Sequence, residues 1–137
     1  MRTVVIYYSY SGSTKKIAEE KAEKESSDIF EVKDVKKPGK FYAYTVGCFK
    51  AMRGKKMKIE PVTIDFSRYE KIIILSPIWA WNNVPQINNI LDMLPAGKKV
   101  EFVAVSASSG GKKERISEII TNRGCELLNY TDIKTGK

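Results

Sequence analysis

TVVIYYSYSGST, residues 3–14, is the stretch that decides the fold. Its first half, residues 3–8, is almost wholly apolar and β-branched or aromatic, which is typical of a central strand buried on both faces. Its second half ends that strand in a polar loop and leads into a helix predicted over about residues 13–25. Backbone N–H groups at the start of such a helix, together with the helix dipole, form a site for an anion.

Strands and helices alternate along the rest of the chain. One helix is predicted to begin at Pro85 and stop at Pro95, and another to stop at Gly124. The segment 41–52 is ambiguous, although Tyr44, Cys48, Phe49 and Met52 could form one helical face. The remaining strands are predicted at residues 29–32, 71–75, 100–105 and 127–130. This order predicts the α/β class, with a parallel sheet and right-handed crossovers, in a single domain over residues 1–137.

The residue content excludes several kinds of chemistry. The chain has no histidine, which removes Ser-His-Asp triads, histidine metal sites and imidazole acid–base catalysis. Cys48 and Cys125 form no CxxC pair and are predicted to be free, buried thiols. The apolar run 4–8 is too short for a signal peptide, and no stretch could span a bilayer, so we expect a cytoplasmic protein without membrane contact.

The chain carries a formal net charge of +8, much of it between residues 33 and 58. Such a field attracts phosphates, acidic proteins or nucleic acid. A solvated lysine-rich surface is a simpler interpretation than a dedicated nucleic-acid site, so we expect no nucleic-acid partner. The cations concerned are Lys33, Lys36, Lys37, Lys40, Lys50, Arg53, Lys55, Lys56 and Lys58.

The first polar loop, residues 9–14, offers four serine and threonine hydroxyls in six residues. They add donors to those of the helix start, and Gly12 allows the backbone to approach an anion closely. The alternative is a Ser/Thr-rich helix cap that binds no ligand. Four such hydroxyls exceed what capping needs, so the loop favours a ligand.

Two further loops follow predicted strands. SPIWAWNN, residues 76–83, carries two tryptophans, which a flat aromatic ligand could cover by stacking. The alternative is that both indoles pack on the core or on a partner. SASSGG, residues 106–111, is a weak signal alone, but all three loops end adjacent strands, where open α/β sheets bind ligands. Neither a GxGxxG nor a P-loop motif is present.

These loops resemble those of the flavodoxin family. Residues 9–14 resemble its phosphate loop, Ser/Thr-x-Ser/Thr-Gly-x-Thr, and residues 76–81 with Pro85 resemble its flavin loop. Residues 47–54 resemble a stretch before the third strand in some members. The resemblance covers nearly the whole chain and implies a three-layer, doubly wound, parallel five-stranded sheet of order 2-1-3-4-5, for which flavodoxin itself is the standard example.

The resemblance also implies FMN as the cofactor. The first loop would bind its phosphate, the second would border the isoalloxazine with Trp79 as the stacking residue, and the third would line the other side of the ring. We expect no catalytic acid or base and no metal ligand. The predicted cofactor-binding residues are Ser9, Tyr10, Ser11, Gly12, Ser13, Thr14, Pro77, Ile78, Trp79, Ala80, Trp81, Asn82, Ser106, Ala107, Ser108, Ser109 and Gly110.

Two features depart from the family pattern. Flavodoxins are usually acidic, whereas this chain is basic and its third loop leads into Lys112 and Lys113, which predicts a less reducing flavin. The family normally ends in a helix, but only residues 134–137 follow the last strand's region here. Because residues 72–75 are apolar on both sides, we expect a bare apolar patch, covered by a second subunit in a homodimer or by segment 41–52.

Three functions are compatible with these features. The leading one is an FMN-binding electron-transfer protein whose redox partner is acidic, as the positive charge suggests. The second is an FMN-dependent NAD(P)H oxidoreductase that acts on quinones. The third is a flavin-free interaction or nucleic-acid module. Whether the protein is an enzyme stays open, and the carrier is favoured.

Overall fold

The computed structural model describes residues 2–36, 39–79, 82–106 and 113–135. Five strands form a parallel sheet, and a short sixth strand pairs antiparallel with the end of the third. The spatial order is β2-β1-β3-β5-β6, so the predicted order 2-1-3-4-5 is confirmed once the short β4 is set aside. The strands are β1 (Thr3–Tyr7), β2 (Asp28–Glu31), β3 (Lys71–Trp79), β4 (Asn82–Asn83), β5 (Lys99–Ser106) and β6 (Glu126–Lys134).

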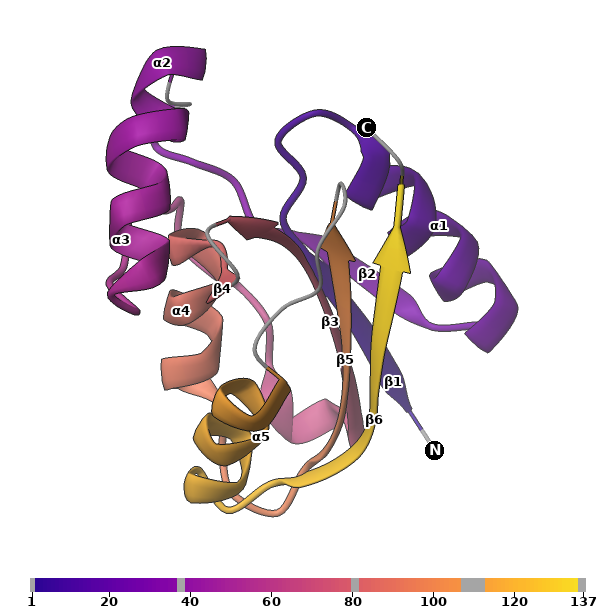
Figure 1. Cartoon of the computed structure of the whole chain (residues 1–137). Helices are drawn as coiled ribbons and strands as arrows, with labels where there is room; N and C mark the ends of the chain where they lie inside the picture. Colours follow the sequence, from indigo (N-terminus) through magenta and orange to yellow (C-terminus); the bar gives the residue numbers. More distant parts are fainter. Residues whose placement is uncertain (1, 37–38, 80–81, 107–112, 136–137) are drawn as a thin grey trace.

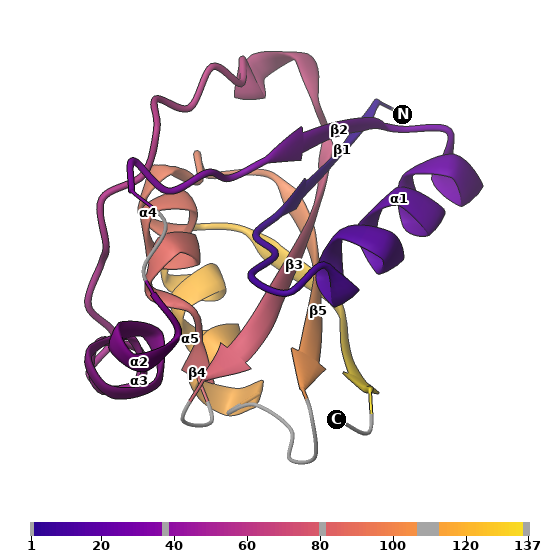
Figure 2. The same ribbon diagram turned by 90° about the horizontal axis from the view of Figure 1, so that it is seen from above.

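Three layers make up the domain, with the sheet in the middle. Helix α1 (Ser13–Glu25) covers one face, and α4 (Pro85–Met93) and α5 (Lys113–Asn122) cover the other (Figures 1 and 2). Successive side chains of a strand point to opposite faces, so an apolar run such as 72–75 serves both layers. Ile72 and Ile74 pack in the core under α4 and α5, whereas Ile73 and Leu75 pack under α1.

Segment 41–52, which the sequence leaves ambiguous, is helical throughout, and its helix begins one residue earlier at Lys40. It runs through α2 (Lys40–Tyr42), the π-helix η1 (Ala43–Gly47) and α3 (Cys48–Met52). These turns follow one another as one column beside the sheet, on the side that α4 occupies (Figures 1 and 2). We call residues 40–52 the column. A single 3-10 turn, η2 (Phe66–Arg68), precedes β3.

The α1 face of the sheet is not bare, so the expectation of a large apolar patch is wrong. Ile73 and Leu75 are fully buried, and Val103 and Val105 are nearly so. No helix follows β6 within the described part of the chain, and the column lies on the opposite face and covers none of this one. Within the described residues, the apolar side chains of β3 and β5 on this face are thus covered by the chain itself.

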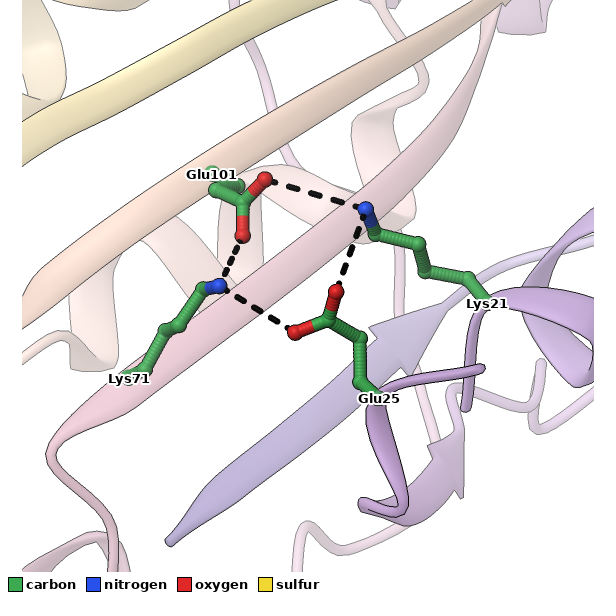
Figure 3. A network of polar contacts seen from close by, with 4 residues as sticks. All are labelled: Lys21, Glu25, Lys71 and Glu101. Carbon is green, nitrogen blue, oxygen red and sulfur yellow. Dashed lines mark hydrogen bonds and ion pairs between the residues drawn. The ribbon is translucent and has the colours of Figure 1, made fainter. Parts of the chain in front are cut away.

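Charged side chains replace apolar ones where α1 ends. Lys71 Nζ lies 2.5 Å from a carboxylate oxygen of Glu101 and 3.2 Å from one of Glu25, and Lys21 closes the ring of four (Figure 3). Burial alone would raise the pKa of Glu101, but Lys71 and Lys21 hold it below its ordinary value. The hydrogen bond to Glu101 raises the pKa of Lys71 in turn. This network covers the end of the sheet face around Lys71 and Glu101 with charged side chains.

Candidate functional site

The C-terminal ends of β1, β3 and β5 meet around a cavity of about 350 Å³. It lies where the strand order reverses, because the chain leaves β1 for β2 on one side and later returns to β3 on the other. All three predicted loops contribute to it. Its lining consists of Tyr10, Ser11, Ser13, Thr14, Pro77, Ile78, Trp79, Val105, Ser106 and Thr135.

The start of α1 gives this cavity a local positive field. Gly12 precedes the helix with a φ of 102°, a left-handed conformation that favours glycine. Its N–H donates a hydrogen bond to Ser9 Oγ at 3.0 Å, so Ser9 shapes the turn, and neither residue lines the cavity. No side chain caps α1, and its first turn holds no acidic residue. The positive end of the helix dipole is therefore available to an anion.

Ser106 closes the opposite wall of the cavity. It is the last residue of β5, it is only 3% exposed, and its Oγ has no hydrogen-bond partner among the described residues. A buried hydroxyl left unpaired costs about 1–3 kcal/mol, so such groups usually face a ligand or water. Thr14 is equally buried across the same cavity. The lining thus offers hydroxyls to a polar ligand, and no charged side chain of the described chain is part of it.

Trp79 forms the aromatic wall and is held by neighbours from separate elements. Its ring meets Tyr10 edge-on at 5.7 Å and Tyr8 edge-on at 6.4 Å, and it rests against Gly47 of the column. Tyr8 is itself anchored, because its hydroxyl donates to Asp34 Oδ2 at 2.6 Å. Burial and that hydrogen bond raise the pKa of Tyr8 well above its ordinary value. The indole is therefore fixed while one side lines the cavity.

Sequence reasoning missed Tyr8 and Gly47 as parts of this site. In the sequence, Tyr8 is simply the last residue of the apolar run of a strand. Gly47 lies in the segment 41–52, whose secondary structure the sequence leaves ambiguous. The aromatic residue directly before the polar loop is the only signal that could have indicated Tyr8. Nothing in the local sequence indicates that Gly47 meets Trp79, because the contact joins segments about thirty residues apart.

Asn82 was predicted to border the ligand, but its side chain serves another purpose. It is 1% exposed, its Nδ2 donates to the carbonyls of Ala51 and Met52, and its Oδ1 accepts from Arg115. It thus ties the end of the column to β4 and does not line the cavity. The remaining predicted residues, Ala80, Trp81, Ala107, Ser108, Ser109 and Gly110, lie outside the described residues.

Other titratable and thiol groups of the described chain lie away from this cavity. Cys48 and Cys125 are free thiols, as predicted, but only Cys125 is buried: Cys48 is half-buried, although burial still raises its pKa. Lys113 lines a separate hollow between α5 and β6 and is not part of the cavity lining. Within the described ranges no group of three metal-ligating side chains comes together, and no helix is long and apolar enough to cross a membrane.

The comparisons with known proteins give one consistent result. No protein-family model matches the sequence, and no curated protein matches it. Solved structures do. A flavoprotein from Lactobacillus acidophilus NCFM, in complex with FMN, superimposes with a TM-score of 0.81 at 24% identity, over 96% of this chain and 92% of that one. This chain has the flavodoxin-like fold.

Two flavodoxins extend the flavodoxin-like comparison to more distant sequences. One from the domain Archaea is 19% identical, with a TM-score of 0.61 over 98% of this chain and 85% of that one. The two-electron reduced flavodoxin of Megasphaera elsdenii is 13% identical, with a TM-score of 0.62 over 95% of this chain and 84% of that one. At these identities the likeness establishes the fold.

Proposed function

We propose that this flavodoxin-like protein binds FMN in the cavity at the ends of β1, β3 and β5 and transfers electrons to and from partner proteins. One observation carries the proposal: an uncapped helix start, a buried Ser106 hydroxyl without a partner among the described residues, and the indole of Trp79 converge on one cavity. The helix start suits the phosphate of FMN, the Ser106 hydroxyl suits a polar edge of the isoalloxazine ring, and the Trp79 indole suits its flat face. The FMN complex of the L. acidophilus flavoprotein supports the choice of cofactor.

Each element of the cavity has its own part in holding the cofactor. Ser11, Ser13 and Thr14, with the amides that open α1, would bind the phosphate through neutral donors. Trp79 would cover the isoalloxazine ring, and Ser106 would offer its hydroxyl to a polar edge of the ring. When bound, FMN supplies the redox chemistry, while the chain positions it and limits its contact with water.

An FMN titration tests this function. We expect the apo protein to quench FMN fluorescence with saturating, one-to-one binding, and the complex to show flavin absorbance. Thr14→Val removes a lining hydroxyl at constant shape and should weaken binding by about ten- to a hundredfold, since a hydrogen bond to a charged group contributes about 1.5–3 kcal/mol. Thr121→Val on α5, an exposed threonine outside the cavity, is the matched control and should bind like the native protein.

Two other results would support the two alternative functions. An absence of FMN binding would contradict the proposal and leave a flavin-free interaction module. Steady oxidation of NADPH with a quinone by the FMN-loaded protein would replace the carrier with an NAD(P)H oxidoreductase. Binding without such turnover supports the carrier.

A further inference from the structure

Among the described side chains of the column, several small residues are buried and several large apolar ones are exposed. Ala43 and Ala51 face inward, fully or almost fully buried, together with Gly47. The outward side carries Tyr42, Phe49 and Met52, exposed by 43%, 49% and 48% respectively. An ordinary surface helix does the opposite, because burying large apolar side chains contributes most to stability. Large apolar groups kept in solvent at helical spacing therefore indicate a surface used for binding.

The column and the residues next to it are strongly basic. No acidic residue occurs between Val35 and Ile59. Lys40 and Arg53 are exposed, and the Arg53 guanidinium lies 5.0 Å from the centre of the Phe49 ring. Among the described cations of residues 35–59, Lys56 alone forms an ion pair, with Asp92. The surface thus combines aromatic, methionine and arginine side chains, the composition enriched in protein interfaces.

The structure holds the column firmly and joins it to the cavity. Asn82 and Asn88 donate hydrogen bonds to carbonyls at its end and just beyond it, Ala51 O and Lys55 O among them. On its inner side Gly47 contacts the indole of Trp79. The outer side is therefore separated from the cavity wall by about one helix diameter, 10–12 Å.

We infer that the exposed surface of the column, formed by Lys40 at its start and by Tyr42, Phe49, Met52 and Arg53, is the docking surface for an acidic electron-transfer protein. This rests on the proposed function. A second copy of the chain does not fit, because two basic surfaces would face each other and repel. A lipid surface fits less well, because the three apolar side chains are interspersed with cations and form no continuous insertion stripe.

Stopped-flow electron transfer tests this assignment. The probe is a reduced, acidic plant-type ferredoxin mixed with the FMN-loaded protein: one electron leaves the iron–sulfur cluster and enters the oxidised flavin. Lys40→Glu with Arg53→Glu should lower the second-order rate at low salt by roughly tenfold or more, and added salt should narrow the difference. Phe49→Ser should lower the rate at every salt concentration.

The control makes the same charge change elsewhere. Lys24→Glu with Lys99→Glu alters two exposed cations, at the end of α1 and the start of β5. It should change the rate less than about threefold, because steering depends on where the charge lies. An equal loss in both double variants would overturn the assignment and leave only an effect of net charge.

Two further measurements separate the remaining outcomes. FMN titration of each variant should give the native affinity. If the native protein failed to bind FMN, the proposed function would fall, whereas native FMN binding with an unchanged ferredoxin rate in the Lys40/Arg53 variant would refute the docking surface alone. Co-sedimentation with phosphatidylserine vesicles that depended on Lys40 and Arg53, without any change in the ferredoxin rate, would assign the surface to a membrane instead.

Discussion

Gly47 lies so close to Trp79 that a Cβ on residue 47 would come 2.8 Å from Cζ3 of the indole. Gly47 ends the π-helix of the column, and Trp79 ends β3 and lines the cavity. The position of the column and the position of the indole are therefore linked through van der Waals contact. Single π-turns inside helices occur frequently at functional sites, and this one brings a glycine to the aromatic wall.

Gly47→Ala should move the indole. Because Tyr8 and Tyr10 hold the ring on other sides, the added methyl displaces it toward the cavity or pushes the column outward. We expect FMN affinity to fall about tenfold and the near-ultraviolet circular dichroism of tryptophan to change, at a stability cost of about 1–3 kcal/mol. Gly39→Ala, where a Cβ meets nothing within 4 Å, is the control. Native spectra and affinity for Gly47→Ala would contradict the link.

Ser106→Ala should leave the stability of the apo protein unchanged or raised but lower its affinity for FMN. Removing a buried hydroxyl that has no partner should leave apo stability unchanged or raise it by about 1 kcal/mol, while FMN affinity falls. Ser76→Ala is the control, because the Ser76 hydroxyl is equally buried but accepts from Val84 N and donates to Pro77 O. That variant should lose about 1–3 kcal/mol in urea unfolding of the apo protein. Similar destabilisation by both variants would show that Ser106 has a structural partner.

Lys71→Met should destabilise the protein strongly, because it leaves Glu101 buried without its closest cation. Breaking a buried ion pair costs about 3–5 kcal/mol, whereas replacing both partners with apolar residues is often neutral. Lys71→Met with Glu101→Leu should therefore be more stable than Lys71→Met alone in urea unfolding. Lys56→Met, which breaks an exposed pair with Asp92, should cost less than about 1 kcal/mol. If the double variant were less stable to urea than Lys71→Met alone, the explanation from a buried, unpaired Glu101 would be wrong.

The same network gives a pH dependence with a defined sign. The pKa of Glu101 is lowered in the folded state, so its contribution is complete above its ordinary pKa of 4.5 and is lost as the pH falls through the folded value. The pKa of Lys71 is raised, so its contribution is lost only as the pH rises through a value above 10.5. Urea unfolding below pH 4.5 should show a shallower loss of stability in Glu101→Gln than in the native protein. Parallel curves would indicate that other carboxylates dominate.

Asn82→Ala should loosen the column without removing a ligand contact. It leaves the carbonyls of Ala51 and Met52 and the guanidinium of Arg115 without their partner, which should cost about 2–4 kcal/mol. Amide hydrogen exchange around residues 51–55 should accelerate, and FMN affinity should stay within about threefold of native if packing is kept. Asn122→Ala, at an exposed helix end, is the control. A large loss of FMN affinity with unchanged exchange would place Asn82 at the ring.

The sequence predicted the sheet well because its strands are apolar on both faces and its loops are polar. It could not predict the column's orientation, since the apolar period of Phe49 and Met52 points to the side that is exposed. The small residues Ala43, Gly47 and Ala51 face inward instead. A π-turn shifts the helical phase, and close packing against Trp79 favours small side chains, so hydrophobicity alone indicates the wrong face.

Local chemistry in the sequence determined the strand–loop–helix unit of residues 3–25, because the apolar run of β1, the left-handed Gly12 and the uncapped helix start are set by residues that are neighbours in the chain. The closure of the sheet face and the fixed place of Trp79 were decided only by tertiary structure. Glu101 is stable in a buried position because Lys71 and Lys21 reach it from other elements, and Trp79 is fixed by rings and a glycine distant in sequence. Pairing energies of this kind depend on distances between segments, which no local pattern contains.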